Sequence, residues 1–341
     1  MFERSHCSAA AALLFAAVVV PTTTKAADFP AKASAPTAVE VPFFTINDNR
    51  LTYAYQFTAT DPGATAKTAK QVYAFTHFDA WAYGTNLFNA IVLKSDHADP
   101  SAPCLKAFQG CAGATEMVGN IRSTFGFNQL FDTKAFSVGP LHNVSFEVGA
   151  DIETENNAVA PNKRAVVAGL QFAFDLPYKG FFNVAPLYYQ EWGHNAFLSS
   201  TFLNSIGVAG GIPDGEVAFR GTWAVETNYY MDFGFLPESL RYFAISGRAV
   251  WIGPKGTGTS LVIPGNIPTV VEFNSEPIRL TFDASKAAWG PKYSHFVDVW
   301  VAYRYWQNKF GLDHTLRSAC LGATAGSCTE SSLYSGVTVK F

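Results

Sequence analysis

The 341-residue chain has 24 Lys and Arg residues against 27 Asp and Glu residues, and a net charge of -3 excludes a strongly basic face for nucleic acid. Aromatic residues make up 15% of the chain and charged residues another 15%, which is aromatic-rich and charge-poor for a soluble protein. The mean hydropathy of +0.08 is too low for a bundle of membrane helices. A barrel whose alternate residues face lipid accounts for both observations, and a secreted β-sandwich is the alternative.

The start of the chain has the pattern of a cleavable export signal. A short segment with Arg4 precedes an apolar run over 8–20, which Pro21 ends, and Ala26 and Ala27 suit a cleavage site. A membrane anchor is the alternative, but the run is short, and no later segment holds roughly 18 uninterrupted apolar residues. We expect a signal peptide over 1–27, a mature N-terminal tail over 28–48 and a barrel over 49–341.

Two-sided strands then follow one another along the chain. In Asn49–Ala59, Leu51, Tyr53 and Phe57 alternate with polar or small residues, which is the period of a strand with one apolar face. The same alternation predicts strands at 49–59, 71–81, 115–127, 142–153, 164–175, 181–192, 217–230, 240–251, 269–273, 277–285, 295–306 and 331–341.

The joints between these strands alternate in length. Leu176–Gly180 is a short hairpin turn, whereas 84–113, 195–215 and 253–265 are long and rich in small residues, and we expect them to be loops. Short turns at one end and longer loops at the other are typical of a single-chain membrane barrel. We therefore predict an all-β fold, a single transmembrane antiparallel β-barrel of about twelve strands with long extracellular loops.

Four cysteines lie in the expected loops, as two local pairs. Cys104 precedes Cys111, and Cys320 precedes Cys328. In an oxidising compartment we expect one disulfide within each pair. A zinc site made by all four thiolates is the alternative, but these spacings are poor for zinc. We expect no metal and no cofactor.

The last strand ends the chain on an aromatic residue. Val337, Val339 and Phe341 share one face, and Thr338 and Lys340 lie on the other. This ending resembles the last strand of bacterial outer-membrane proteins, in which a final Phe is an assembly signal. The resemblance implies location in the bacterial outer membrane, contact with its lipid, and recognition of Phe341 by the assembly machinery.

The more polar face of the strands carries charges of both signs together with aromatic rings. Arg, Asp and Glu dominate over Lys, which suits paired charges in a confined wet lumen, and aromatic rings there could stack on flat solutes. The alternative is that these side chains only fill a small barrel and pair with one another. The candidate lumen and substrate-binding residues are Tyr73, Phe75, Asp79, Trp81, Glu116, Arg122, Glu147, Arg220, Glu226, Arg248, Arg279, Asp298, Trp300, Arg304 and Trp306.

Several segments resemble the nucleoside-specific channel proteins called Tsx. The similar segments are Glu116–Asp151 with Arg122-Ser123 and Ser137-Val138-Gly139-Pro140, Gly169–Trp192 with Asp175-Leu176-Pro177, Val301–Trp306, and Phe75–Trp81 followed by Tyr83-Gly84. The resemblance implies a barrel that passes nucleosides through a narrow lumen, where aromatic and ionisable side chains bind them. The two cysteine pairs and the loop at 100–113 depart from that pattern. We expect a channel for small solutes with nucleosides or similar molecules as partners, and no nucleic acid.

Two other classes of function remain as alternatives. A lipid-modifying barrel enzyme would use a Ser-His-acid set, and His77, His142, His194 and His295 are the candidates. None of them lies in a G-x-S-x-G or H-E-x-x-H motif, so we do not expect an enzyme. The second class is a structural or adhesin-like barrel with a plugged lumen, which would show no conductance.

Overall fold

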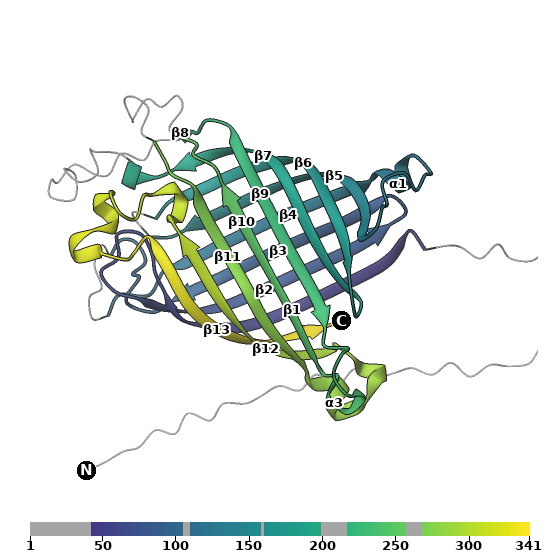
Figure 1. The fold of residues 1–341 in the computed structure, drawn as a ribbon. Helices are drawn as coiled ribbons and strands as arrows, with labels where there is room; N and C mark the ends of the chain where they lie inside the picture. The colour runs from purple at the N-terminus through teal and green to yellow at the C-terminus, as the bar shows by residue number, and fades with distance from the viewer. Residues whose placement is uncertain (1–41, 105–109, 158–159, 199–216, 257–267) are drawn as a thin grey trace, which may run out of the picture. The chain divides into compact units, whose positions relative to one another are not determined.

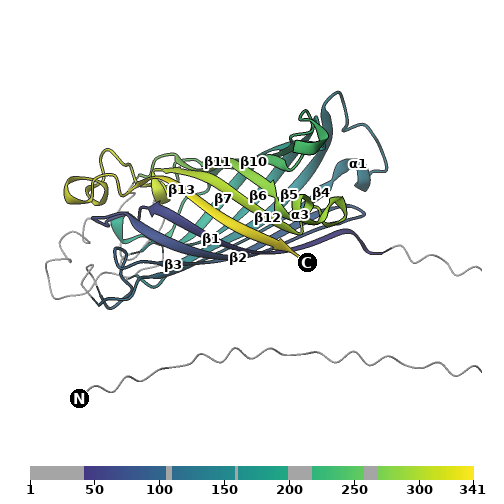
Figure 2. The same ribbon diagram turned by 90° about the horizontal axis from the view of Figure 1, so that it is seen from below.

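The computed structural model describes residues 42–104, 110–157, 160–198, 217–256 and 268–341. The expected signal peptide and most of the expected tail lie outside these residues. The described part contains thirteen strands in one sheet, and the helices are short (Figures 1 and 2). No helix in the described ranges is long and apolar enough to cross a bilayer.

Twelve long strands form the wall, and the two-residue β8 pairs only with the end of β7. The strands are β1 (Phe44–Ala59), β2 (Thr68–Trp81), β3 (Gly84–Ser95), β4 (Thr115–Gly126), β5 (Leu141–Glu155), β6 (Asn162–Leu176), β7 (Gly180–His194), β8 (Val217–Ala218), β9 (Thr222–Asp232), β10 (Phe243–Ile252), β11 (Glu272–Asp283), β12 (Val297–Gln307) and β13 (Thr329–Lys340).

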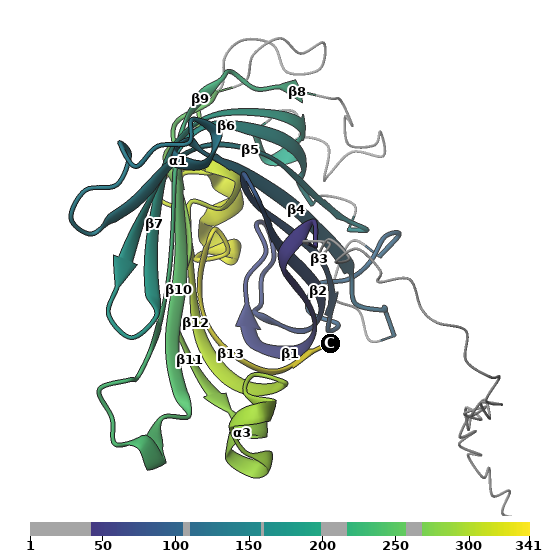
Figure 3. The same ribbon diagram turned by 90° about the vertical axis from the view of Figure 1, so that its right-hand side faces the viewer.

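The sheet closes on itself, so the predicted all-β antiparallel barrel is confirmed. Each long strand pairs antiparallel with the next one along the chain, β7 pairs directly with β9, and β1 pairs with β13. The closing pair runs in register from Arg50 opposite Lys340 to Gln56 opposite Tyr334. Figure 3 shows the ring of strands end-on. Closure leaves none of the twelve long strands with an unpaired edge.

The two ends of the barrel differ. We call the end where β1 begins and β13 stops the turn end, and the opposite end the loop end (Figure 1). The turn end carries α1 (Phe127–Leu130), η2 (Glu238–Leu240), α3 (Ala284–Trp289) and η3 (Pro291–Tyr293). The loop end carries η1 (Ala196–Leu198), η4 (Lys309–Gly311), η5 (Ser318–Cys320) and η6 (Gly322–Thr324).

One contact identifies the inner face of the wall. The Arg122 side chain on β4 reaches Glu226 on β9, although three strands separate β4 from β9 along the sheet. The two residues can meet only across the interior. Residues of the opposite parity, such as Leu51, Met117 and Leu333, are 54–55% exposed and form an apolar outer face. This division is that of a barrel with lipid outside and a polar interior.

Several element boundaries differ from the sequence expectation, among them the strand expected at 217–230, which is divided into β8 and β9. The segment expected as a loop from residue 84 contains β3, whose inner Leu87 and Ile91 and outer Phe88 are all apolar, so its alternation was hidden. The two strands expected at 269–273 and 277–285 are one strand, β11. Its register shifts between Ser275 and Ile278, a bulge that accommodates a proline. The barrel also begins earlier than residue 49, at Phe44.

Candidate lumen site

A charged network crosses the middle of the barrel around Arg122. Its Nη2 donates to Glu226 Oε1 at 2.7 Å, and its Nη1 lies 2.9 Å from Asp151 Oδ1. Gly149 stands opposite Arg122 on β5, where an added Cβ would lie 2.6 Å from Arg122 Cδ. The missing side chain therefore gives the guanidinium its path across the lumen. Glu147 lies on the same inner face of β5, two residues from Gly149 toward the turn end, and accepts from Gln171 Nε2 at 2.8 Å.

A stack of flat side chains covers the inner face of β11, β12 and β13. The Arg279 guanidinium lies 3.9 Å from the centre of the Trp300 ring, and Arg279 Nε donates to Glu276 Oε1 at 2.5 Å. Trp300 packs edge-on to Tyr334 and over Gly336, where a Cβ would be 2.5 Å from the indole. Because Gly336 has no side chain, the Trp300 ring lies close against the wall.

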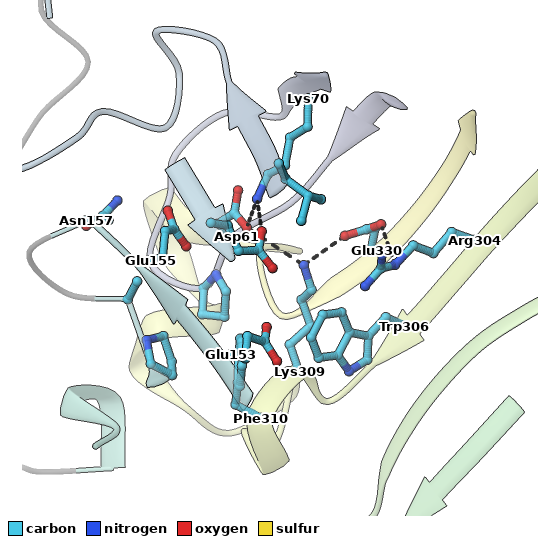
Figure 4. A pocket seen from close by; sticks show the side chains of 15 residues that line it. Asp61, Lys70, Glu153, Glu155, Asn157, Arg304, Trp306, Lys309, Phe310 and Glu330 are labelled. Carbon is cyan, nitrogen blue, oxygen red and sulfur yellow. Dashed lines mark hydrogen bonds and ion pairs between the residues drawn. The ribbon is translucent and has the colours of Figure 1, made fainter. Parts of the chain in front are cut away.

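A buried cluster of charges lies inside the barrel near the loop end (Figure 4). Lys70 Nζ lies 2.9 Å from Asp61 Oδ1 and 3.0 Å from Glu116 Oε2. Lys309 Nζ lies 2.8 Å from Glu330 Oε2 and also donates to a backbone carbonyl. These side chains border a cavity of about 30 Å³, which is room for about one water molecule.

The loop-end cluster controls the ionisation of a loop carboxyl. Burial raises the pKa of Asp61, but the nearby ammonium groups of Lys70 and Lys309 outweigh this and hold that pKa below its usual range. Asp61 is therefore a carboxylate that binds two lysines from different elements. Its charge links the loop after β1 to β2 and to the segment after β12.

The segment 308–328 folds over the loop end, and we call it the cap. Leu312 and the Cys320–Cys328 disulfide are buried with Phe219 in a small apolar core. The Gly63 N–H donates to the carbonyl oxygen of Ala319 at 3.1 Å, which ties the cap to the loop after β1. The other cysteine pair, Cys104 with Cys111, also forms a disulfide.

The structure places ten of the fifteen candidate residues on the inner face: Glu116, Arg122, Glu147, Glu226, Arg248, Arg279, Asp298, Trp300, Arg304 and Trp306. They do not form one site. Glu116, Arg304 and Trp306 belong to the loop-end cluster, and Asp298 lies at the turn end. The remaining inner residues line the middle of the lumen.

The four candidates on β2 were assigned to the wrong face. Tyr73, Phe75, Asp79 and Trp81 share the outer parity with Tyr53, and Tyr73 is 47% exposed. Both faces of β2 are bulky, so alternation did not distinguish them. Asp79 is nevertheless buried, because Asn86 and His77 hydrogen-bond to it at the turn end of the outer face. The fifth misplaced candidate, Arg220, is an exposed residue between β8 and β9.

Sequence reasoning missed most of the loop-end cluster. Lys70, Lys163 and Glu330 each stand one residue before a predicted strand, on the inner parity of β2, β6 and β13. Extending each predicted strand by one residue would have added these charges to the polar face. Lys309 and Asp61 come from loops, and the alternation pattern carries no signal for them.

A second group of ionisable residues gathers at the turn end. His295 Nδ1 lies 3.0 Å from Asp298 Oδ1 and 3.9 Å from Asp283 Oδ2. Both oxygens of Asp283 already accept donors, including the N–H of Lys286 and the hydroxyls of Ser285 and Ser294. The group therefore organises the connection between β11 and β12, and its hydrogen bonds account for the positions of all three side chains.

No family model matches the sequence, and neither does any curated protein. Among solved structures, the KdgM porin aligns over 87% of this chain and 99% of its own, at 9% identity and a TM-score of 0.37. The beta domain of the Bordetella autotransporter BrkA aligns over 86% and 98%, at 9% identity and 0.33. Pseudomonas aeruginosa OpdK with vanillate aligns over 88% and 100%, at 10% identity and 0.27. The functional argument therefore comes from the residues of this chain.

Proposed function

We propose that this chain is a bacterial outer-membrane channel for small polar solutes. The observation that carries the proposal is the bridge from Arg122 to Glu226 across the interior of a closed barrel whose outer face is apolar. Apolar surface outside and paired charges inside suit a wall between lipid and a wet lumen. The export signal expected over 1–27 supports the same location, and outer-membrane lipid is the partner of the outer face.

Nucleosides are the solute class that we favour. Tyr334 and the Arg279 guanidinium, which covers the buried Trp300 ring, provide flat surfaces on the inner face, and a planar base can stack on such surfaces. Carboxylates and amides elsewhere on the inner face can hydrogen-bond ribose hydroxyls. The resemblance to Tsx-like channels supports the same solute. Under this proposal no residue performs covalent chemistry, and the protein is not an enzyme.

The buried cluster at the loop end favours a second candidate function. Lys70, Lys309 and Glu330 lie in the interior there around a cavity of about 30 Å³, which holds about one water molecule and is too small for a nucleoside. Under the channel proposal the cap and its ion pairs must separate during transport. A permanently plugged structural barrel, in contrast, keeps these contacts.

Planar-bilayer recording with the purified full chain tests both candidates. The channel proposal expects open current that added adenosine reduces, and Y334L should weaken this block about tenfold, because base stacking contributes roughly 1–3 kcal/mol. Y293L is the matched control, since Tyr293 is 45% exposed at the turn end. A protein that never conducts supports the plugged barrel. Open current that adenosine leaves unchanged excludes nucleosides and retains the channel.

A further inference from the structure

Arg248 differs from the other inner arginines in having no partner within the part of the chain that the structure describes. Arg50 binds Asp48, Arg122 binds Asp151 and Glu226, Arg279 binds Glu276, and Arg304 binds Glu330. Arg248 makes no hydrogen bond or ion pair with any residue that the structure describes. It lies on the inner parity of β10, opposite Asn228 on β9 and opposite Glu276 on β11.

The acids nearest to Arg248 are already neutralised. Glu276 Oε1 accepts from Arg279 Nε at 2.5 Å, and both oxygens of Glu226 accept from Arg122, at 2.7 and 3.1 Å. The next two strands around the wall, β11 and β12, each add another inner arginine, Arg279 and Arg304. Arg248 is therefore the one of these three arginines without a bound carboxylate among the described residues.

The surroundings of Arg248 offer further hydrogen-bond donors. Asn228 accepts from Asn183 through its Oδ1 at 3.0 Å, which leaves its amide N–H groups without a partner among the described residues. The Ser246 hydroxyl, two residues before Arg248 on the same face, is likewise unbonded in the described ranges. Arg248 and Asn228 are both exposed although they face inward, so water reaches this part of the lumen.

We propose that Arg248, with Asn228 and Ser246, binds the oxyanion of a transported solute, either a carboxylate or a phosphate. A guanidinium presents a planar fork of donors that matches both groups, and an unpaired one in a confined lumen attracts them. The inference rests on the proposed channel function and refines its substrate class. A nucleoside carrying a phosphate would place its base near the flat side chains of β11–β13 and its anion on Arg248.

The test compares neutral and anionic members of two matched pairs. The probes are adenosine against AMP, and benzamide against benzoate, titrated calorimetrically into the detergent-solubilised full chain and also added to bilayers as blockers. The anion of each pair should bind about tenfold more tightly, because hydrogen bonds to charged groups are the stronger ones. R248Q should reduce this ratio to about one. R248K should retain part of it, since the charge remains but the fork is lost.

The control is R241Q, because Arg241 is exposed at the turn end and binds only the carbonyl oxygen of Leu236 in the described structure. It removes the same net charge and should leave the ratio unchanged. A preference for AMP or for benzoate that R248Q abolishes supports the proposal, and the pair that shows it identifies phosphate or carboxylate. Equal binding within both pairs, or a ratio that survives R248Q, overturns it. Anion binding without any current rejects the channel function and leaves the anion site standing.

Discussion

Large side chains inside this barrel owe their positions to glycines on the neighbouring strands. Arg122 crosses the lumen because Gly149 leaves room beside it, and Trp300 lies flat because Gly336 does the same on β13. In both cases the glycine and the large side chain are cross-strand neighbours on the inner face. Alternation in the sequence can show that a residue faces inward. The residue opposite it on the next strand determines the direction that its side chain takes inside the barrel.

His295 provides a prediction about pH dependence. The hydrogen bond to Asp298 raises the pKa of His295 above 6.5, and burial opposes this only in part. A raised folded-state pKa means that the stabilisation is complete below pH 6.5 and is lost as the pH rises through the folded value. Thermal unfolding midpoints measured between pH 5 and pH 9 should therefore show a decrease with rising pH that the D298N variant lacks.

The control for this prediction is H142N. His142 pairs with Asp175, but both side chains are largely exposed, so their pair contributes little. H142N should retain the pH dependence and H295N should abolish it. An NMR titration that finds the His295 pKa at or below 6.5 would contradict the assignment.

At the scale of elements, strands were predictable wherever only one face is apolar. β5 and β13 alternate cleanly, and their predicted faces agree with the structure. β3 is apolar on both faces and was missed, and β2 is bulky on both faces and was reversed. The proline-containing bulge split β11 in two. The predicted count of twelve long strands was right because the missed β3 and the divided β11 compensate.

The ion pair between Lys309 and Glu330 should hold the cap against the barrel wall. Lys309 is buried and holds Glu330 and the carbonyl oxygen of Thr60, so K309Q should loosen the contact between the cap and β13. Breaking a buried ion pair by removing one partner costs about 3–5 kcal/mol. The amide of Gly63, which bonds to the Ala319 carbonyl, should then exchange with solvent more than tenfold faster.

Two comparisons make the cap experiment specific. K292Q removes a lysine from η3 at the opposite end and should leave the exchange of Gly63 unchanged. K309R keeps a cation beside Glu330 and should retain part of the protection, because the ion pair can still form. Unchanged Gly63 exchange in K309Q would show that the disulfide-bonded core holds the cap without the ion pair.

For the molecule as a whole, closure of the barrel was predictable from the sequence and the loop-end cluster was not. The last strand indicated a barrel because one of its faces is apolar and the other polar, and β1 and β12 pair with it on either side. The loop-end cluster depends on Asp61 and Lys309 in loops, and these residues meet only after the barrel has closed. Alternation along one strand contains no information about such contacts.

Deletion of Phe341 should reduce assembly of the protein in the outer membrane much more than it reduces the stability of the folded barrel. The N–H of Phe341 donates to the Asn49 carbonyl oxygen at 3.0 Å, and its ring is 65% exposed, so deletion should change the free energy of unfolding of the refolded protein by only about 0.5 kcal/mol. If the assembly machinery recognises this residue, deletion should still reduce the amount of folded protein in the outer membrane of an expressing cell. F57L, at a residue 50% exposed on the outer face of β1, should leave both quantities unchanged. Equal membrane levels for the deletion and F57L would mean that the aromatic ending contributes only to the outer face, and a large loss of refolded stability would mean that it closes the barrel.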